Sequence, residues 1–188
     1  MNQGLHPHRR GFTLIEMMTV ITIIIILAGI TVAGMGFITD RQANAKAKVD
    51  IELLSKAIEE YKLDFGDYPG FDEHTDVEGD VSDELYNALF YEGYVALEAN
   101  GGDGSIDIYL NELDPRSGKQ SWVAKTNANR PPADLQIVDP WGRPYRYRKG
   151  DNAQNPDFDL WSTGKDGLTN PANPQKTLTG NKDDVRNF

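Results

Sequence analysis

The fold of this chain is decided by residues 11–38, whose sequence is GFTLIEMMTVITIIIILAGITVAGMGFI. From Phe12 onward these are 27 residues, and Glu16 is the only ionisable one among them. As an α-helix the run is about 40 Å long, which is enough to cross the ~30 Å hydrocarbon core of a bilayer. A carboxylate inside such a segment costs at least a few kcal/mol. The stretch therefore predicts one membrane-crossing helix in which Glu16 needs a partner.

A short basic leader precedes the apolar run. Its basic side chains are His6, His8, Arg9 and Arg10. The positive-inside rule keeps such a leader on the cytoplasmic side. A secretory signal peptide would carry its cleavage site after the apolar region and would lose that region. Here the only sharp boundary comes before it, so that cleavage between Gly11 and Phe12 would leave the whole helix on the mature chain with a new amine on Phe12.

Residues 10–16, RGFTLIE, resemble the processing site of type IV pilins and type II secretion pseudopilins. The resemblance implies that a prepilin peptidase cuts after Gly11 and methylates the new amine of Phe12. It also implies that Glu16 lies near the Phe12 amine of a neighbouring subunit in a filament. That pairing would supply the counter-charge that a buried carboxylate requires. The alternative is an ordinary single-pass signal anchor with a stray glutamate.

Length and composition narrow the remaining choices. The chain has 188 residues, and the leader and membrane helix take about 40 of them, which leaves room for one domain. It has no cysteine, which excludes thiolate metal sites, cysteine nucleophiles and disulfides. Many type IV pilins fix a C-terminal loop with a disulfide, so this absence favours a pseudopilin or a metal-stapled relative. The net charge of −10 becomes −12 without Arg9 and Arg10 (−10 − 2), which argues against nucleic-acid binding.

The helical period continues beyond the membrane segment. Residues four apart are apolar at Val49, Leu53, Ala57, Tyr61 and Phe65, with Leu54 and Ile58 on the adjacent stripe. We predict one helix from about Phe12 to Leu63 or Phe65, ended by Gly66 and the turn at residues 68–70. Residues 12–38 form its transmembrane half and residues 39–66 its amphipathic half. The amphipathic half needs a covering partner.

Residues 67–137 are interpreted as a variable acidic insertion. Between positions 64 and 114 the chain carries 15 acidic side chains and no Lys or Arg. Within this region Ser82 to Tyr91 is predicted to be a short helix capped by Ser82 or Asp80 and ended by Gly93, and residues 106–110 alternate as in a strand. An EF-hand loop does not fit, because the required ligand positions fall on non-ligating residues. The acidic stretch is interpreted as a solvated face rather than a cation site.

Residues 138–188 contain the clearest strand pattern. Aromatic and charged residues alternate in 145–148 and again in 158–162, with a polar turn between them. Two adjacent strands joined by a turn form an antiparallel pair, which would cover the amphipathic helix half. The predicted fold class is therefore α+β, with a long N-terminal spine helix packed by a small antiparallel sheet.

The polar C-terminal loop carries three carboxylates, on Asp166, Asp183 and Asp184. Gathered together they would repel one another unless a cation neutralised them. Oxygen ligands without nearby His or Cys favour a hard ion, and Ca²⁺ suits a flexible oxygen set better than Mg²⁺. Solvated turns are the alternative.

The C-terminal motifs also resemble a known family. They are DPWGRPY at 139–145, FDLWSTGKDG at 158–167 and DDV at 183–185. Together they resemble the C-terminal region of the major pseudopilin of type II secretion, in which one calcium ion ties down the loop. The resemblance implies Asp166, Asp183 and Asp184 as side-chain ligands, Thr163 as a carbonyl ligand and Asn181 as a further one. It covers residues 10–69 and 138–188 and completes the expected pilin fold with a metal-stapled loop.

These patterns predict a structural subunit of a type II secretion pseudopilus. The expected partners are further copies in a filament, prepilin peptidase, minor pseudopilins and an inner-membrane assembly platform. The expected location is the bacterial inner membrane, with a single span and the soluble domain in the periplasm, where the assembled filament also lies. Alternatives are a type IV pilin or minor pilin of an adhesion, motility or DNA-uptake fibre, or a membrane-anchored ligand-binding module that uses Trp122 and nearby tyrosines.

Enzymatic activity is not expected. The chain has three histidines, and cleavage would remove His6 and His8. His74 lies in an acidic loop without a partner for base catalysis, and no Gly-x-Ser-x-Gly elbow or phosphate-binding glycine loop occurs. The sequence leaves open which proteins are exported and whether the subunit is major or minor.

Overall fold

The computed structural model describes residues 11–70, 81–100, 106–117, 122–126, 128–170, 172 and 179–188, with backbone alone for 32–38, 100 and 179. The chain divides into two compact units. The first is Met1–Arg41 and the second, called the soluble unit below, is Gln42–Phe188. Each is described by itself. His74 lies outside the described residues, as does part of the acidic insertion.

Helix α1 spans Leu14–Phe65 and contributes to both units. It begins two residues after the predicted start, because Thr13 takes the capping position. Its predicted end is confirmed. Gly66 follows with φ of 80° and donates its N–H to the Lys62 carbonyl at 2.8 Å. Glycine suits this left-handed position because it has no Cβ to clash with the backbone.

The buried face of α1 in the soluble unit differs from the predicted stripe. Its buried side chains are Ala47, Asp50, Ile51, Leu54, Ala57 and Ile58. Val49 is 53% exposed and Phe65 is 48% exposed, so the prediction was wrong for these two residues. The buried face is rotated about the helix axis from the predicted apolar face. Apolar spacing alone did not define the buried face, because Ala47 and Asp50, which lie on it, are not strongly apolar.

Three short strands form one antiparallel sheet in the order β1-β2-β3. They are β1 at Arg146–Lys149, β2 at Phe158–Ser162 and β3 at Val185–Arg186. The first two confirm the predicted hairpin, with Arg146 paired to Trp161 and Lys149 to Phe158. The third was not predicted, since two residues carry no readable alternation.

Strand β2 is buried at every position, whereas alternation predicted burial on one face only. The polar residue Asp159 is fully buried because Arg148 on β1 forms an ion pair with it at 2.7 Å. The Arg148 guanidinium in turn lies 5.2 Å from the Trp161 ring. The polar positions of β2, which alternation placed on the solvent side, are therefore buried by the Arg148–Asp159 ion pair and the Trp161 ring.

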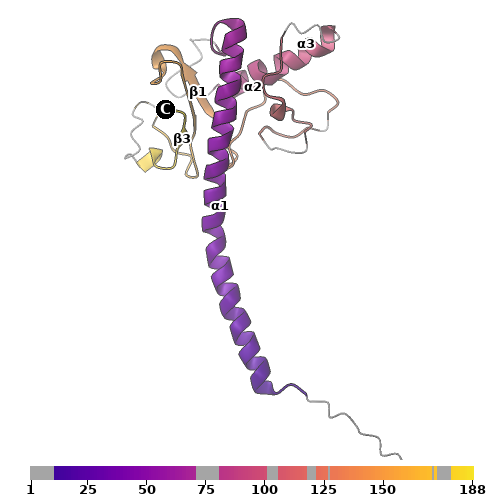
Figure 1. The fold of residues 1–188 in the computed structure, drawn as a ribbon, viewed down its shortest axis with the longest axis vertical. Coiled ribbons are helices and arrows are strands. Elements are labelled where there is room, and N and C mark those ends of the chain that lie inside the picture. Colours follow the sequence, from indigo (N-terminus) through magenta and orange to yellow (C-terminus); the bar gives the residue numbers. More distant parts are fainter. Residues whose placement is uncertain are drawn as a thin grey trace, which may run out of the picture. The chain divides into compact units, whose positions relative to one another are not determined.

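The sheet covers the amphipathic half of α1, as predicted (Figure 1). The Tyr145 hydroxyl donates to the buried Asp50 carboxylate at 3.2 Å, and the Tyr147 hydroxyl donates to the Pro69 carbonyl at 3.1 Å. Lys149 at the end of β1 binds the turn that follows α1, at 2.8 Å from the Tyr68 carbonyl. These contacts fix the sheet along the helix and leave the C-terminal loop beside it.

The insertion forms a longer helical segment than predicted. It consists of α2 (Ser82–Tyr86), the π-helix η1 (Asn87–Tyr91) and α3 (Glu92–Asn100). The predicted stop at Gly93 was wrong. A Cβ at that position would lie 2.4 Å from the Asp107 carbonyl oxygen, so glycine is needed for close packing rather than for termination. The Ser82 hydroxyl does not cap the helix but bonds the Ile137 backbone.

Residues 106–110 do not form the predicted strand. The backbone N–H groups of Tyr109 and Leu110 both donate to the carbonyl of Leu89 in the π-helix, at 3.0 and 3.2 Å. These two N–H groups are therefore bonded to the helical segment and not to a neighbouring strand. The remaining short turns are the 3₁₀ helices η2 (Asn111–Leu113), η3 (Gly150–Asn152) and η4 (Thr179–Asn181).

Candidate functional site

The N-terminal segment places Glu16 in the first turn of α1. Its Oε2 atom lies 2.8 Å from the backbone N of Thr13 and 2.8 Å from the Thr13 hydroxyl. The Glu16 N–H in turn donates to the Thr13 hydroxyl oxygen at 3.3 Å. This reciprocal pair is a capping box, which satisfies donors that the helix leaves free. The role of Thr13 was missed, although its Thr-x-x-Glu spacing could have revealed it.

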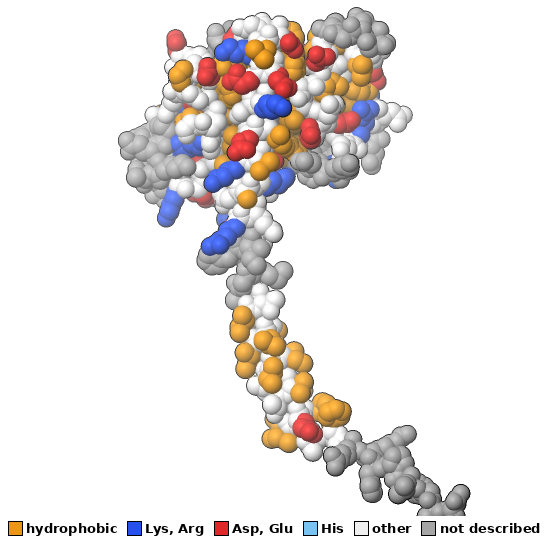
Figure 2. Space-filling model, viewed as in Figure 1, with side chains coloured by type: hydrophobic (Ala, Val, Ile, Leu, Met, Phe, Trp, Pro, Cys, Tyr) orange, Lys and Arg blue, Asp and Glu red, His pale blue; other side chains and the backbone are white. Residues whose placement is uncertain are grey.

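The apolar half of α1 contains a window, Leu14–Thr31, that is long and apolar enough to cross a membrane. None of that window is buried within the protein, and Figure 2 shows hydrophobic side chains along this part of the helix. The hydroxyls of Thr19, Thr22 and Thr31 each donate to the carbonyl four residues earlier, at 2.8–2.9 Å. Such internal bonds satisfy polar groups that find no water in lipid.

Phe12 and Gly11 precede the helix and are exposed. Nothing lies within 4 Å of the position that a Cβ on Gly11 would occupy. The predicted cut therefore falls at exposed residues that precede the helix rather than inside it. The counter-charge expected for Glu16 belongs to another subunit, so in the single chain Thr13 is its partner.

The C-terminal loop brings together residues that are distant in sequence. Gly164 adopts φ of 63°, and a Cβ there would lie 2.5 Å from the Asp183 carbonyl oxygen. The Asp166 N–H donates to Asp183 Oδ2 at 2.9 Å, and the Asn170 N–H donates to Asn181 Oδ1 at 2.6 Å. The loop after β2 thus packs directly on the segment that leads into β3.

The polar atoms of this loop test whether a cation would fit. Three buried side-chain oxygens have no hydrogen-bond partner in the described part of the chain: Thr163 Oγ1, Asp183 Oδ1 and Asp184 Oδ1. Buried acceptors without a donor are costly, and a hard cation would satisfy them. The donor chemistry therefore fits calcium. The Asp166 side chain is exposed and accepts the Leu168 N–H at 2.7 Å.

Asp184 also has a protein cation beside it. Arg186 lies 2.9 Å from Asp184 Oδ2, and both side chains are buried. The Thr169 hydroxyl donates to the same oxygen at 3.0 Å. Burial raises the pKa of Asp184, while these two hydrogen bonds oppose that rise. Among the described residues, no three His, Cys, Asp or Glu side chains gather as metal ligands. A bound ion would therefore need backbone or hydroxyl oxygens as well.

A second group of residues, centred on Asp139, forms hydrogen bonds that orient the start of the loop. The sequence did not reveal this group. Asp139 Oδ1 accepts the N–H groups of Trp141 and Arg143, both at 2.9 Å, and its Oδ2 accepts the Ser162 hydroxyl at 2.6 Å. The Ser162 oxygen accepts the Gly164 N–H at 3.0 Å. The Arg143 side chain completes the group by donating to the Gly164 carbonyl. The turn at 139–144 thus orients the loop at Gly164.

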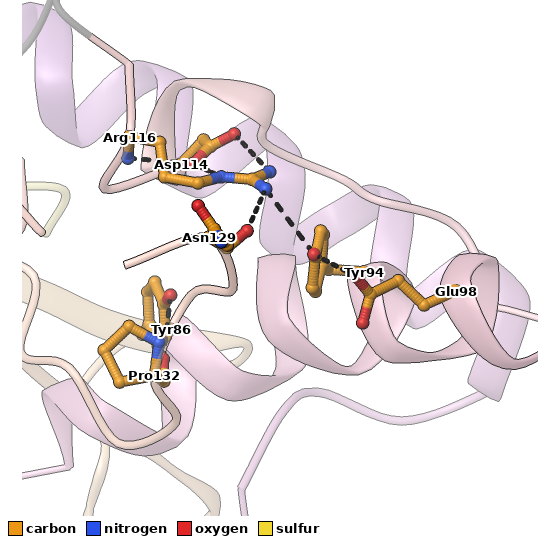
Figure 3. Close-up of polar contacts among 7 residues, drawn as sticks. All are labelled: Tyr86, Tyr94, Glu98, Asp114, Arg116, Asn129 and Pro132. Atoms are coloured by element: carbon orange, nitrogen blue, oxygen red, sulfur yellow. Dashed lines mark hydrogen bonds and ion pairs between the residues drawn. The ribbon is translucent and has the colours of Figure 1, made fainter. Parts of the chain in front are cut away.

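The insertion is held by a polar cluster around Arg116. Its guanidinium binds Asp114 through two parallel bonds of 2.9 Å and reaches the Asn129 carbonyl at 3.2 Å. Figure 3 shows it reaching between Asp114, Asn129 and Tyr94, whose hydroxyl bonds Glu98 on α3. The cluster anchors α3 to the loops that contain Asp114 and Asn129.

Trp122, the tryptophan of the ligand-binding alternative, is buried. Trp122 is 1% exposed and belongs to the core. The neighbouring Tyr86 is also fully buried, and its hydroxyl donates to the Pro132 carbonyl at 3.2 Å. The alternative in which Trp122 presents a binding surface is therefore not supported, because the insertion uses this side chain for packing.

Two protein families match this chain, one at its N-terminus and one in its C-terminal half. The family described as "Prokaryotic N-terminal methylation motif" matches residues 6–32. The family described as "Type II secretion system (T2SS), protein G" matches residues 110–181. The resemblance therefore extends further towards the N-terminus than residues 138–188. No solved structure gives a significant match.

Relatives match over most of the chain. The type II secretion system core protein G of Klebsiella michiganensis is 28% identical over 182 residues, covering 96% of this chain and 93% of the relative. The protein of the same name from Pseudomonas aeruginosa is 27% identical over 157 residues, 84% of each chain. That of Vibrio cholerae is 28% identical over 84% of this chain and 83% of the relative. The chain is therefore similar to type II secretion system core protein G over most of its length, and its N-terminal part matches the N-terminal methylation motif.

Proposed function

We propose that this protein is a structural subunit of a type II secretion pseudopilus. The observation that carries the proposal is the joining of an exposed, membrane-length apolar helix to a soluble unit that matches the protein G family. An apolar helical segment that is not buried within the protein, such as Leu14–Thr31, must find lipid or other helices to cover it. A filament of parallel copies, held together through this helix, provides that cover.

Processing by prepilin peptidase would expose the amine that the assembly needs. Cleavage after Gly11 places a positive amine on Phe12, four residues before Glu16. In the single chain Glu16 holds Thr13, so a neighbour's amine would have to take over or share that carboxylate. The ammonium of a second subunit is a stronger partner than a neutral hydroxyl, because a charge-assisted bond is about twice as strong.

The location of the protein in the cell follows from the apolar helix and the basic leader. The basic leader would remain in the cytoplasm, the apolar half of α1 would span the inner membrane and the soluble unit would lie in the periplasm. Assembly there would require the prepilin peptidase, minor pseudopilins and an inner-membrane platform.

The assembly proposal is tested with the full chain and its secretion system in cells. Wild-type protein should lose its first 11 residues and appear in sheared filaments, with mass spectrometry showing N-methylated Phe12. Replacing Gly11 with leucine should leave the longer precursor in the membrane. Glu16→Gln should be cleaved normally yet enter filaments poorly. Normal filaments from both variants would refute the proposal.

We also propose that the C-terminal loop binds one calcium ion. The predicted Thr163 carbonyl would hold it together with Thr163 Oγ1, Asp183 Oδ1 and Asp184 Oδ1, which lack a hydrogen-bond partner among the described residues. Asp166 and Asn181 are the further predicted ligands. The ion would neutralise the adjoining carboxylates and fix a polar loop that has little apolar surface of its own.

The metal proposal has its own experiment. Saturating calcium at about 100 times the Kd should stabilise the detergent-solubilised chain by about 2.7 kcal/mol relative to chelator. Asp183→Asn should remove most of this calcium-dependent difference. Asp151→Asn, at an exposed carboxylate in the turn after β1, is the matched control and should keep it. An unchanged melting temperature on chelation would reject the metal site without affecting the filament proposal.

A further inference from the structure

Arg186 is a buried cation that lies beside the predicted calcium ligand Asp184. Its Nη2 atom donates to Asp184 Oδ2 at 2.9 Å, and the two side chains are 4% and 0% exposed. The same guanidinium lies over the Phe188 ring, 5.3 Å from the ring centroid, and reaches the Asn181 carbonyl at 3.5 Å. The chain therefore supplies a positive charge of its own at the place where calcium is expected.

The sheet fixes the backbone at Arg186. This residue lies on β3 opposite Trp161 of β2. The next residue, Asn187, donates its N–H to the Leu160 carbonyl at 3.1 Å, and its side chain accepts the Leu160 N–H at 2.7 Å and donates to the Phe158 carbonyl at 3.1 Å. These bonds lie within the chain, so the position of Arg186 does not depend on a bound ion.

Each of the two adjoining carboxylates has one oxygen that the chain engages. Asp184 Oδ2 accepts Arg186 and the Thr169 hydroxyl, the latter at 3.0 Å. Asp183 Oδ2 accepts the N–H of Asp166 at 2.9 Å. The Oδ1 atoms of Asp183 and Asp184 are buried and have no hydrogen-bond partner among the described residues. Arg186 thus compensates the charge of Asp184, whereas the donor to Asp183 is a neutral amide.

A cation built into the chain has two opposite effects on an ion held by the remaining oxygens. Without the ion, it offsets part of the repulsion between the two carboxylates and so stabilises the loop. With the ion bound, it repels calcium, because like charges a few ångströms apart in a buried site interact strongly. Removing the cation should therefore destabilise the calcium-free protein and tighten calcium binding.

We propose that Arg186 sets the calcium affinity of the C-terminal loop by sharing the Asp184 carboxylate with the ion. Arg186 occupies Oδ2 and leaves Oδ1 to calcium, so the loop keeps its packing without the ion and binds it more weakly than it would without the arginine. A groove of about 660 Å³, lined by Asp183, Asp184 and Arg186, would admit the ion from solvent. This inference rests on the proposed calcium site and names the residue that regulates it.

Calcium titration of the full chain in detergent, by calorimetry after chelator treatment, tests this role. Arg186→Gln should lower the Kd for calcium by at least about tenfold and should lower the melting temperature in chelator by several degrees. Arg186→Lys keeps the charge and should keep the Kd close to that of wild type. Lys182→Gln is the matched control, because Lys182 lines the same groove but is exposed. Water and salt screen its charge, so its removal should change the Kd by less than about threefold.

A purely structural role for Arg186 gives a different result. Arg186→Gln would then lose stability equally with and without calcium, its Kd would stay unchanged or rise, and the inference would be overturned while the calcium site stood. A variant that stays unfolded in saturating calcium would also overturn it, because the ion should replace the arginine. Folding of Arg186→Gln only when calcium is present would support it. Absence of calcium binding by wild type and Arg186→Gln alike would reject the calcium site and this inference with it.

Discussion

Replacing Gly164 with alanine tests whether the C-terminal loop is built by close packing on Asp183. Gly164 has φ of 63°, a left-handed conformation that costs a residue with a Cβ about 1–2 kcal/mol. The added Cβ would also lie 2.5 Å from the Asp183 carbonyl oxygen and 2.8 Å from its carboxyl carbon. Real contacts do not reach these distances, so Asp183 must move.

The cost of that movement can be worked from the contacts it breaks. The Asp166 N–H would lose its 2.9 Å bond to Asp183, which is worth about 1 kcal/mol. Conformational and packing terms together give about 2–4 kcal/mol. Gly142 is a matched control, because it has φ of 83° and nothing within 4 Å of a Cβ. Gly142→Ala should therefore cost only the conformational term, about 1–2 kcal/mol.

The assay is unfolding of the full chain in detergent, followed by tryptophan fluorescence. Trp161 reports on this region, because it is buried in β2 just before the loop. Gly164→Ala should melt below Gly142→Ala by several degrees, at roughly 3 °C per kcal/mol for a unit of this size. Equal melting temperatures for the two variants would show that Gly164 does not pack against Asp183 and would refute the described loop.

Three further predictions concern the soluble unit. Asp159→Ala removes the carboxylate that pairs with buried Arg148 and should lower the free energy of unfolding by about 3–5 kcal/mol in urea titrations, and a loss under 1 kcal/mol would contradict the buried pair. Burial raises the pKa of the Asp50 carboxyl in the folded protein. The stability gained from its protonated form is therefore fully present below the pKa of an unfolded aspartate, about 3.9, and is lost as the pH rises through the higher folded pKa. Asp50→Asn should thus gain stability over wild type in urea titrations at pH 7 compared with pH 4, and a pH-independent difference would count against it. Arg116→Lys keeps the charge but loses the paired bonds to Asp114, and should cost about 1 kcal/mol and increase hydrogen exchange in α3; unchanged exchange would show that the cluster does not anchor it.

The insertion illustrates how composition can mislead about side-chain roles. Its acidic residues and aromatics suggested a solvated face with a possible ligand surface. The structure instead uses Trp122 and Tyr86 as core, because the helical segment from Ser82 to Asn100 needs a packing partner. Described carboxylates such as Glu92, Glu98 and Glu112 remain exposed, and Asp107 lies beside those of the end of α1.

The sequence by itself determined the features that depend on local pattern. The apolar run at 11–38, the end of α1 at Gly66 and the hairpin at 145–162 could be read directly, because period, glycine and alternation act over a few residues. The identities of Asp183 and Asp184 as loop carboxylates were equally visible, although their metal role stays a prediction.

The tertiary structure alone decided how those elements meet. It chose the face of α1 that is buried, since Tyr145 reaches Asp50 rather than covering Val49. In the structure the helical segment continues past Gly93, and the Leu89 carbonyl accepts the N–H groups of residues 109 and 110. Asp139 is linked to Gly164 through the Ser162 hydroxyl. These contacts join residues far apart in the chain, and their energies come from packing and paired polar groups that no local window of sequence contains.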